Sequence, residues 1–259
     1  MPKSSELILD KKSRRIEARK QVVYELISGG SGLVLALFMW GHIVFVGSIL
    51  TGRRGFDWLA TTLEHYYIAQ PTVAAIFTLF LVHAVFAARK IPAQLRERRQ
   101  VRELAKGLHA SGRERVESRR ETSPFVPHLE SLLWIWQVRT GMIILVLGSF
   151  HLVLLGVDIY TPLFGAGAGI ESATSLARVS AGLWLPYSIL LLCVEFHASV
   201  GLYRLAVKWG AGIALSRRVL RNVERLLLWF FLGLGVLVLL VLAELMPPPL
   251  GCLLSAAPA

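Results

Sequence analysis

Long apolar segments alternate with short polar or basic connections along almost the whole chain of 259 residues. An α-helix needs about 20 predominantly apolar residues to cross the roughly 30 Å hydrocarbon core of a bilayer. Five segments reach or approach this length: Leu26–Leu50, Pro71–Ala88, Leu132–Val157, Leu183–Leu202 and Leu226–Leu245. The pattern predicts an all-α integral membrane bundle of five transmembrane helices, and residues 1–259 are expected to form a single membrane domain.

Lysine and arginine are concentrated in three of the segments outside the spans. Seven precede the first span, eleven lie in residues 89–131 and six in residues 203–225, whereas the other two connections hold only Arg53, Arg54 and Arg178. Segments rich in Lys and Arg stay in the cytoplasm. The sequence therefore predicts a cytoplasmic N-terminus and a C-terminus on the outside. The protein is expected to contact membrane lipid. Its net charge of +11 is explained by this topology and is not a sign of nucleic-acid binding.

The segments between the spans carry less specific signals. The basic residues 1–25 are expected to lie as an amphipathic helix on the cytoplasmic surface. Residues 89–131 form either a solvated loop or hairpin, or a docking surface for a peripheral partner. The small-residue-rich connection 158–182 is expected to be irregular. Pro186 is expected either to kink the fourth span or to lie in its first turn.

Four histidines lie inside four different spans: His42, His83, His151 and His197. An ionisable side chain at membrane depth is costly unless it is paired, solvated or ligated. At about 1.5 Å of rise per residue, the distances to the span ends predict an outer pair, His42 with His151, and an inner pair, His83 with His197. Two imidazoles saturate a haem iron, so the pattern predicts two haem b groups that carry single electrons.

Residues near the four histidines add further candidates. Gly148 and Gly201 share a helix face with a histidine and could let a macrocycle approach the backbone. Lys208, and alternatively Arg204, is a candidate partner of a haem propionate on the inner side, although either could equally be an anchor at the membrane surface. His128 lies close enough to the membrane edge to reach a propionate, whereas His65 and His109 are expected to be solvated or structural.

Two carboxylates are candidate proton-handling groups. Glu195 lies two residues before His197, so the two side chains point to opposite sides of the helix. It is either a hydrogen-bonded packing residue or part of a proton path through the bundle. Glu64 lies at the outer entrance of the second span, where it could be an ordinary loop glutamate or the base that accepts protons from a quinol.

Parts of all five spans resemble the dihaem cytochrome b subunit of quinol:fumarate reductases and succinate:quinone oxidoreductases. The likeness is most specific around residues 195–210 and 132–151. It is carried by the segments MWGHIVFVGSIL, LVHAVFAARKIP, HLESLLWIWQVRTGMIILVLGSFHLVLL and VEFHASVGLYRLAVKWG.

The resemblance implies roles for particular residues. In that family, four histidines on the first four spans bind two haem b groups, which carries over onto His42, His83, His151 and His197. A glutamate matching Glu64 is assigned to quinol oxidation near the outer haem, and one matching Glu195 to proton transfer across the membrane.

The resemblance also implies partners and a location. Two soluble subunits are expected on the cytoplasmic side: an iron–sulfur subunit and a flavoprotein that interconverts fumarate and succinate. The chain itself is expected to lie in the bacterial inner membrane, to react with menaquinone or another quinone, and to hold no dicarboxylate site. A dimer of the whole complex is compatible with this arrangement.

The leading hypothesis is therefore a membrane electron conduit that takes electrons from menaquinol near the outer face. The same parts could run in reverse as a succinate:quinone reductase. A proton-coupled transporter with His and Glu relay groups, a haem-free anchor, and the cytochrome b of another oxidoreductase, such as a formate dehydrogenase or hydrogenase, are the alternatives.

Overall fold

A computed structural model of the chain describes the backbone of residues 4–89, 91–93, 95–97, 99–100, 103–104, 129–161, 163–164 and 170–252, and most of their side chains from residue 16 onward. These residues form helices and connecting turns, and no strand occurs among them. The α-helices are α1 (Ser4–Gly47), α2 (Arg53–His65), α3 (Ala69–Ala88), α5 (Leu129–Tyr160), α6 (Ser172–Arg178), α7 (Trp184–Lys208), α8 (Ala211–Ala214) and α9 (Arg217–Leu242). A 3₁₀ turn, η1 (Ser48–Thr51), follows α1, and a π-helical turn, η2 (Val179–Leu183), joins α6 to α7.

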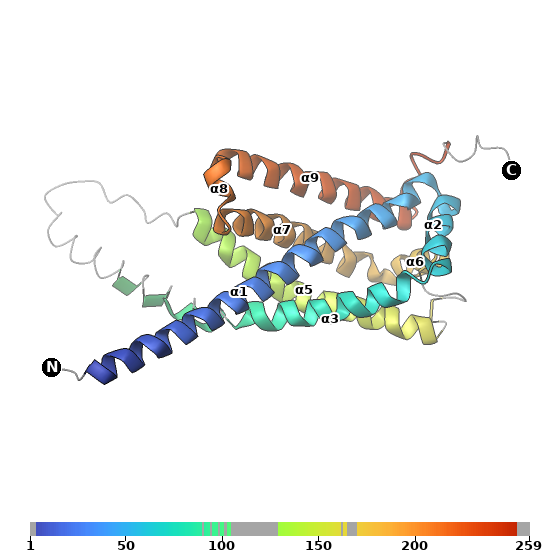
Figure 1. Cartoon of the computed structure of the whole chain (residues 1–259). Helices are drawn as coiled ribbons and strands as arrows, with labels where there is room; N and C mark the ends of the chain where they lie inside the picture. The colour runs from blue at the N-terminus through green and yellow to red at the C-terminus, as the bar shows by residue number, and fades with distance from the viewer. Residues whose placement is uncertain are drawn as a thin grey trace, which may run out of the picture.

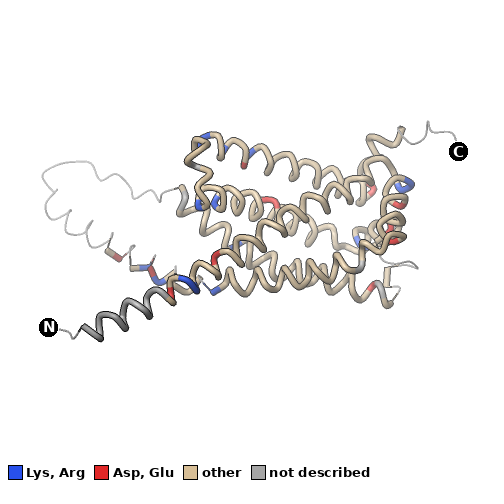
Figure 2. The backbone as a smooth tube through the Cα atoms, in the orientation of Figure 1, with Lys and Arg blue, Asp and Glu red and all other residues tan. Residues whose placement is uncertain are grey.

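The five expected membrane spans are confirmed. Five helical segments are long and apolar enough to cross a bilayer: Ile16–Thr51, Pro71–Glu97, Ser131–Asp158, Ser172–Lys208 and Arg217–Leu242. The long helices run alternately up and down beside one another, and the two termini lie at opposite ends of the bundle (Figure 1). Lys and Arg gather at the two ends of the bundle, with a long stretch of few charges between them (Figure 2). Below, the end that holds the N-terminus and α8 is called the basic end, and the other is the α2–α6 end.

The first helix differs from the sequence-based expectation for residues 1–25. A separate helix on the membrane surface is wrong, because α1 is one continuous helix of 44 residues from Ser4. At 1.5 Å per residue it is about 66 Å long, twice the hydrocarbon thickness. Its N-terminal part extends past the other helices at the basic end (Figure 1). The segment contains no proline after Pro2 to break the helix, and contacts from Tyr24 and Glu25 to neighbouring helices hold it in line.

The connection between α5 and α7 is also more ordered than expected. Residues 172–178 are helical, so the prediction of an irregular segment is wrong there. Asp57 of α2 supplies the missing cap: its carboxylate accepts hydrogen bonds from the Ser172 backbone N–H at 2.7 Å and from the Ser172 hydroxyl at 2.9 Å. A local sequence pattern cannot show a cap that comes from another helix.

The fourth span bends at a glycine and not at its proline. Gly182 has φ of +96°, a backbone conformation that side chains disfavour, and it separates η2 from α7. Pro186 lies in the first turn of α7, where backbone N–H groups have no partner within the helix. The second of the two expectations for Pro186 is therefore confirmed.

The most densely buried apolar cluster lies at the α2–α6 end. It joins η1, α2, α6, η2 and the end of α9, and it includes Ile49, Phe56, Ala60, Leu176 and Val238. Many large apolar side chains along the five spans are exposed, as expected for helices in contact with lipid. Phe45 of α1 and Tyr187 of α7 pack against this cluster, which therefore joins the ends of α1, α7 and α9 to α2 and α6.

Candidate functional site

The inner pair of histidines faces each other across the bundle. His83 lies on α3 and His197 on α7, with ring centroids 6.4 Å apart and ring planes at 89°. A metal–imidazole bond is about 2.0 Å long and a ring centroid lies roughly 1 Å behind its nitrogen, so two rings on opposite sides of one ion have centroids about 6 Å apart. The spacing fits two axial ligands of one haem iron.

In each inner ring, a hydrogen bond at one nitrogen leaves the other nitrogen available to bind a metal. His83 Nδ1 lies 3.1 Å from the backbone oxygen of Ser28, and His197 Nδ1 lies 2.9 Å from that of Gln137. A carbonyl oxygen only accepts, so each Nδ1 carries the proton and donates it. Nε2 then keeps its lone pair, as a metal ligand must.

Each inner ring lies in a cradle on the preceding long helix. On α1 the cradle consists of Ser28, Ser31 and Gly32, and on α5 of Gln137, Thr140 and Gly141. The hydroxyl oxygens of Ser31 and Thr140 lie 3.2 Å and 3.5 Å from the Nδ1 atoms of His83 and His197. A Cβ added at Gly32 would lie 2.8 Å from His83 Cε1, and one at Gly141 would lie 2.9 Å from His197 Cε1.

The two cradles have the same spacing of three groups: an accepting backbone carbonyl at position i, a hydroxyl at i+3 and a glycine at i+4. The motifs SGGSG (28–32) and QVRTG (137–141) are the sequence signals, and sequence reasoning missed both. It chose Gly148 and Gly201, whose added Cβ atoms would meet Phe80 and the Gln137 side chain, respectively. The glycines that contact the ligand rings lie on the partner helix, which a search along one helix cannot find.

The outer pair is built differently. His42 on α1 and His151 on α5 lie near enough for their charges to interact. His42 stacks on Phe38 at 5.8 Å between centroids, and His151 makes an edge contact with Tyr187 at 5.4 Å. His151 Nδ1 and the Tyr187 hydroxyl are both buried and have no hydrogen-bond partner within the described part of the chain. Orphaned buried polar atoms of this kind fit a site that receives a polar group or water.

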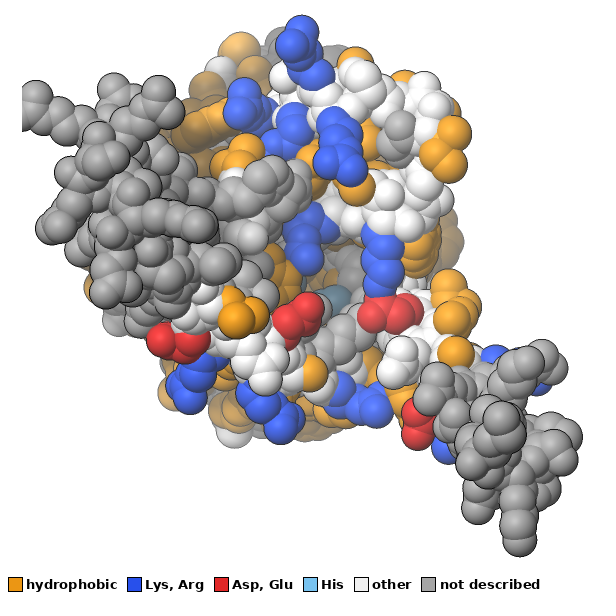
Figure 3. Space-filling model, turned by 90° about the vertical axis from the view of Figure 1, so that its left-hand side faces the viewer, with side chains coloured by type: hydrophobic (Ala, Val, Ile, Leu, Met, Phe, Trp, Pro, Cys, Tyr) orange, Lys and Arg blue, Asp and Glu red, His pale blue; other side chains and the backbone are white. Residues whose placement is uncertain are grey.

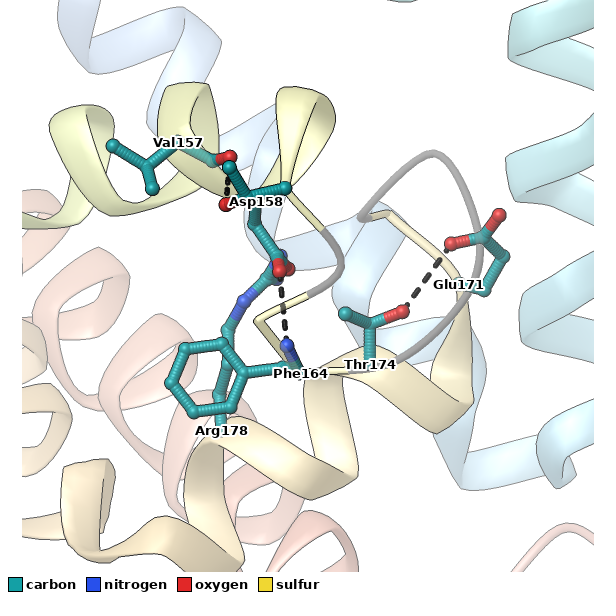
Figure 4. Close-up of polar contacts among 7 residues, drawn as sticks. Val157, Asp158, Phe164, Glu171, Thr174 and Arg178 are labelled. Atoms are coloured by element: carbon teal, nitrogen blue, oxygen red, sulfur yellow. Dashed lines mark hydrogen bonds and ion pairs between the residues drawn. The ribbon is translucent and has the colours of Figure 1, made fainter.

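A buried ion pair joins α6 to the end of α5 (Figure 4). The Arg178 guanidinium, on α6, donates to Asp158 at the end of α5, and the two side chains are 5% and 1% exposed. Asp158 Oδ1 also accepts the backbone N–H of Phe164 at 3.1 Å. Arg178 acts electrostatically on His151. Sequence reasoning counted Arg178 only as a topology charge, because a loop arginine gives no sign of its burial.

Glu64 lies in the last turn of α2, at the same end of the molecule as the outer pair. It is partly buried, and this burial, followed by the negative charge of Glu171, raises the pKa of the Glu64 carboxyl above its ordinary value. Glu171 accepts a hydrogen bond from Thr174 at 3.3 Å. A carboxyl with a raised pKa is a better proton acceptor than an ordinary surface glutamate.

Glu195 is 1% exposed and lies on a different side of α7 from His197. His197 faces α5, whereas Glu195 lies beside Trp40 of α1. Glu195 Oε2, the Trp40 indole nitrogen and Ser199 Oγ have no hydrogen bond of normal geometry to any described residue. Three orphaned polar atoms in one buried region fit the presence of internal water more easily than simple packing.

The candidate propionate partners lie at the basic end. Lys208 forms an ion pair with Glu25 of α1, and Arg204 donates to the side chain of Gln137. His128 lies outside the described residues. Figure 3 views this end and shows a hollow bordered by acidic and basic side chains, with a histidine visible at depth.

Comparison with known proteins gives consistent matches. Residues 114–242 match the family model of the succinate dehydrogenase/fumarate reductase transmembrane subunit. The fumarate reductase cytochrome b subunit of Wolinella succinogenes is 32% identical over 235 residues, which cover 86% of this chain and 82% of that protein. The subunit of the same name from Helicobacter pylori strain 26695 is 30% identical over 220 residues, covering 82% and 76% of the two chains.

Proposed function

Because the chain belongs to the family of cytochrome b membrane subunits of fumarate reductases and succinate dehydrogenases, we propose that it binds two haem b groups and links quinol oxidation to soluble redox subunits. Residues 1–259 act as one membrane domain in this proposal. The family membership and the five spans make the chain a multi-pass membrane subunit, which in bacteria lies in the inner membrane.

The geometry of His83 and His197 carries the proposal. Two imidazoles lie 6.4 Å apart between ring centroids, and each has Nδ1 held by a backbone carbonyl, so both Nε2 atoms would be available to hold one haem iron. The hydrogen bonds fix each ring before any ligand arrives, so little rotamer freedom is lost on binding. His42 and His151 hold the second haem near the α2–α6 end. When bound, the haems supply single-electron transfer between the two sides of the membrane.

Quinol chemistry is assigned to the outer end. Oxidation of menaquinol, or of another quinol, releases two protons with two electrons. Glu64 accepts protons there, since its raised pKa makes the carboxylate a stronger base than an ordinary glutamate. Glu195, with the nearby orphaned polar atoms of Trp40 and Ser199, holds and moves protons within the bundle.

Charge suggests the sidedness, and family membership suggests the partners. Lys and Arg are concentrated in residues 1–25, 89–131 and 203–225, so by the positive-inside rule the basic end faces the cytoplasm. An iron–sulfur subunit and a flavoprotein dock there, and Lys208 would bind a haem carboxylate at this end. The relatives are named as fumarate reductase subunits, which favours the quinol:fumarate direction over succinate oxidation and over a proton-coupled transporter.

A dithionite-reduced minus oxidised spectrum of the purified complex, with pyridine-haemochrome quantitation, tests the proposal. Two haem b per chain are expected. Replacement of His83, His197, His42 or His151 by Ala should remove one haem in each case, whereas His65→Ala, on the exposed surface of α2, should leave both. A haem content of zero or one in the unaltered complex would contradict the proposal.

A further inference from the structure

Two adjacent side chains of α1 reach the two helices that carry the inner histidines. The Tyr24 ring lies under the Arg89 guanidinium, whose carbon is 3.7 Å from the ring centroid, and it contacts Phe86 at 5.7 Å between centroids. Arg89 and Phe86 belong to the end of α3. Glu25 forms an ion pair with Lys208 at the end of α7. One turn of α1 therefore bridges α3 and α7 at the basic end.

The bridge lies just beyond the inner histidine cradle. Tyr24 and Glu25 precede Ser28 by three or four residues, which corresponds to roughly 5 Å along the helix axis. Gly29 brings α1 close to α7, because an added Cβ there would lie 2.8 Å from Leu205 Cδ1 and 3.0 Å from the Trp209 ring. Packing elsewhere pairs α3 chiefly with α1, and α5 chiefly with α7. The spacing between α3 and α7, on opposite sides of the inner site, is thus set by α1.

We propose that Tyr24 and Glu25 form a clamp at the basic end of the inner haem site that holds α3 and α7 at the separation that the two histidines need. Tyr24 and Glu25 are positioning residues: they affect the inner haem indirectly, through the spacing of His83 and His197 and through Lys208. This inference rests on the proposed dihaem function and adds to it a control of haem retention.

The clamp also contributes a negative charge to the site. Glu25 shares Lys208 with the haem carboxylate that this lysine is proposed to bind. A carboxylate near the iron stabilises the more positive, oxidised state. Loss of this charge should therefore raise the reduction potential of the inner haem. The Glu25 and Lys208 side chains are 32% and 52% exposed, so salt should screen the effect.

The test uses the whole complex with paired variants. Glu25→Gln removes one arm of the clamp, and Tyr24→Leu removes the other. Tyr24→Phe keeps the aromatic face for Arg89, and Glu17→Gln removes a charge from an exposed position further along α1; these are the controls. The inner haem is identified as the redox step that is lost in His83→Ala. The measurements are the rate of haem transfer to excess haem-free myoglobin and the midpoint potential of each haem.

Either clamp variant should lose the inner haem roughly threefold to tenfold faster, the size expected for one exposed ion pair or cation–π contact, and leave the outer haem unchanged. Glu25→Gln should also raise the inner midpoint potential, by less at high salt, whereas both controls should behave like the unaltered complex. Two haems in every variant with unchanged loss rates and potentials would overturn the clamp and leave the dihaem proposal standing. A complex without haem would overturn the dihaem proposal itself.

Discussion

The inner and outer histidine pairs are held in place by different kinds of contact. At the inner pair, backbone carbonyls hold both Nδ1 atoms, and two glycines let the rings lie against the helices. At the outer pair, His151 has an aromatic neighbour in Tyr187 and lies near the buried pair of Arg178 and Asp158. Side-chain substitution cannot remove a backbone acceptor. The inner site should therefore tolerate polar substitutions better than the outer site and tolerate added volume worse.

Removal of Arg178 should cause the largest loss of stability and of outer haem. Arg178→Ala leaves the buried Asp158 carboxylate without its cation, and breaking a buried pair costs about 3–5 kcal/mol of stability. Thermal unfolding in detergent, followed with haem content, should show a lower Tm and selective loss of the outer haem. Glu244→Gln is the matched control: it breaks the exposed Arg53–Glu244 pair, at 62% and 64% exposure, and should cost less than about 1 kcal/mol. Equal effects of the two changes would argue against a special role of the buried pair.

Added volume in the inner cradles should have the second-largest effect, a loss of inner haem. Gly32→Ala or Gly141→Ala places a methyl group within 2.9 Å of a ligand ring, and overpacking of this kind typically costs about 1–3 kcal/mol. We expect reduced inner haem content with the outer haem intact. Gly30→Ala and Gly156→Ala, where an added Cβ meets open space, should leave both haems in place. If all four variants bind haem alike, the cradles do not position the rings.

Loss of the cradle hydroxyls should have a smaller effect. Thr140→Ala or Ser31→Ala removes one hydroxyl near Nδ1 and leaves the carbonyl acceptor, so the expected change is about 0.5–1.5 kcal/mol in haem affinity. Tyr187→Phe removes the buried hydroxyl beside His151, where neither this hydroxyl nor His151 Nδ1 has a partner among the described residues, so its effect on the outer haem would come from a water or polar group that the two atoms share. A larger effect of Tyr187→Phe on the outer haem than of Thr140→Ala on the inner haem would support the comparison, and the reverse order would refute it.

The smallest expected change concerns pH. Glu64 must be deprotonated to accept a proton, so quinol oxidation should rise with pH through its pKa. Burial and then the charge of Glu171 raise that pKa. Glu171→Gln removes the second cause, lowers the Glu64 pKa and should shift the acid limb of the pH–rate profile to lower pH by less than about one unit, because water screens the pair. A shift to higher pH, or none, would contradict the assignment of Glu64 as the base.

The membrane spans were predictable because a bilayer imposes a length and an apolar composition that a single sequence displays directly. For Pro186 the sequence left two alternatives, a kink or the first turn of the helix, and the structure decided for the first turn of α7. The helix at residues 172–178 was not predictable, since its cap comes from Asp57, more than a hundred positions away in the chain. The buried environment of Arg178 also depends on a distant partner, Asp158, on the preceding long helix.

The sequence alone determined the five spans, the resemblance to the family that the comparisons confirmed, and the presence of one histidine in each of four spans, because hydropathy and residue type are properties of single segments. The tertiary structure decided which atoms meet: Nδ1 of His83 and His197 with carbonyls on other helices, Lys208 with Glu25, and Glu195 with Trp40. These contacts depend on the rotation and spacing of packed helices, which side chains from several elements set together and no one segment encodes.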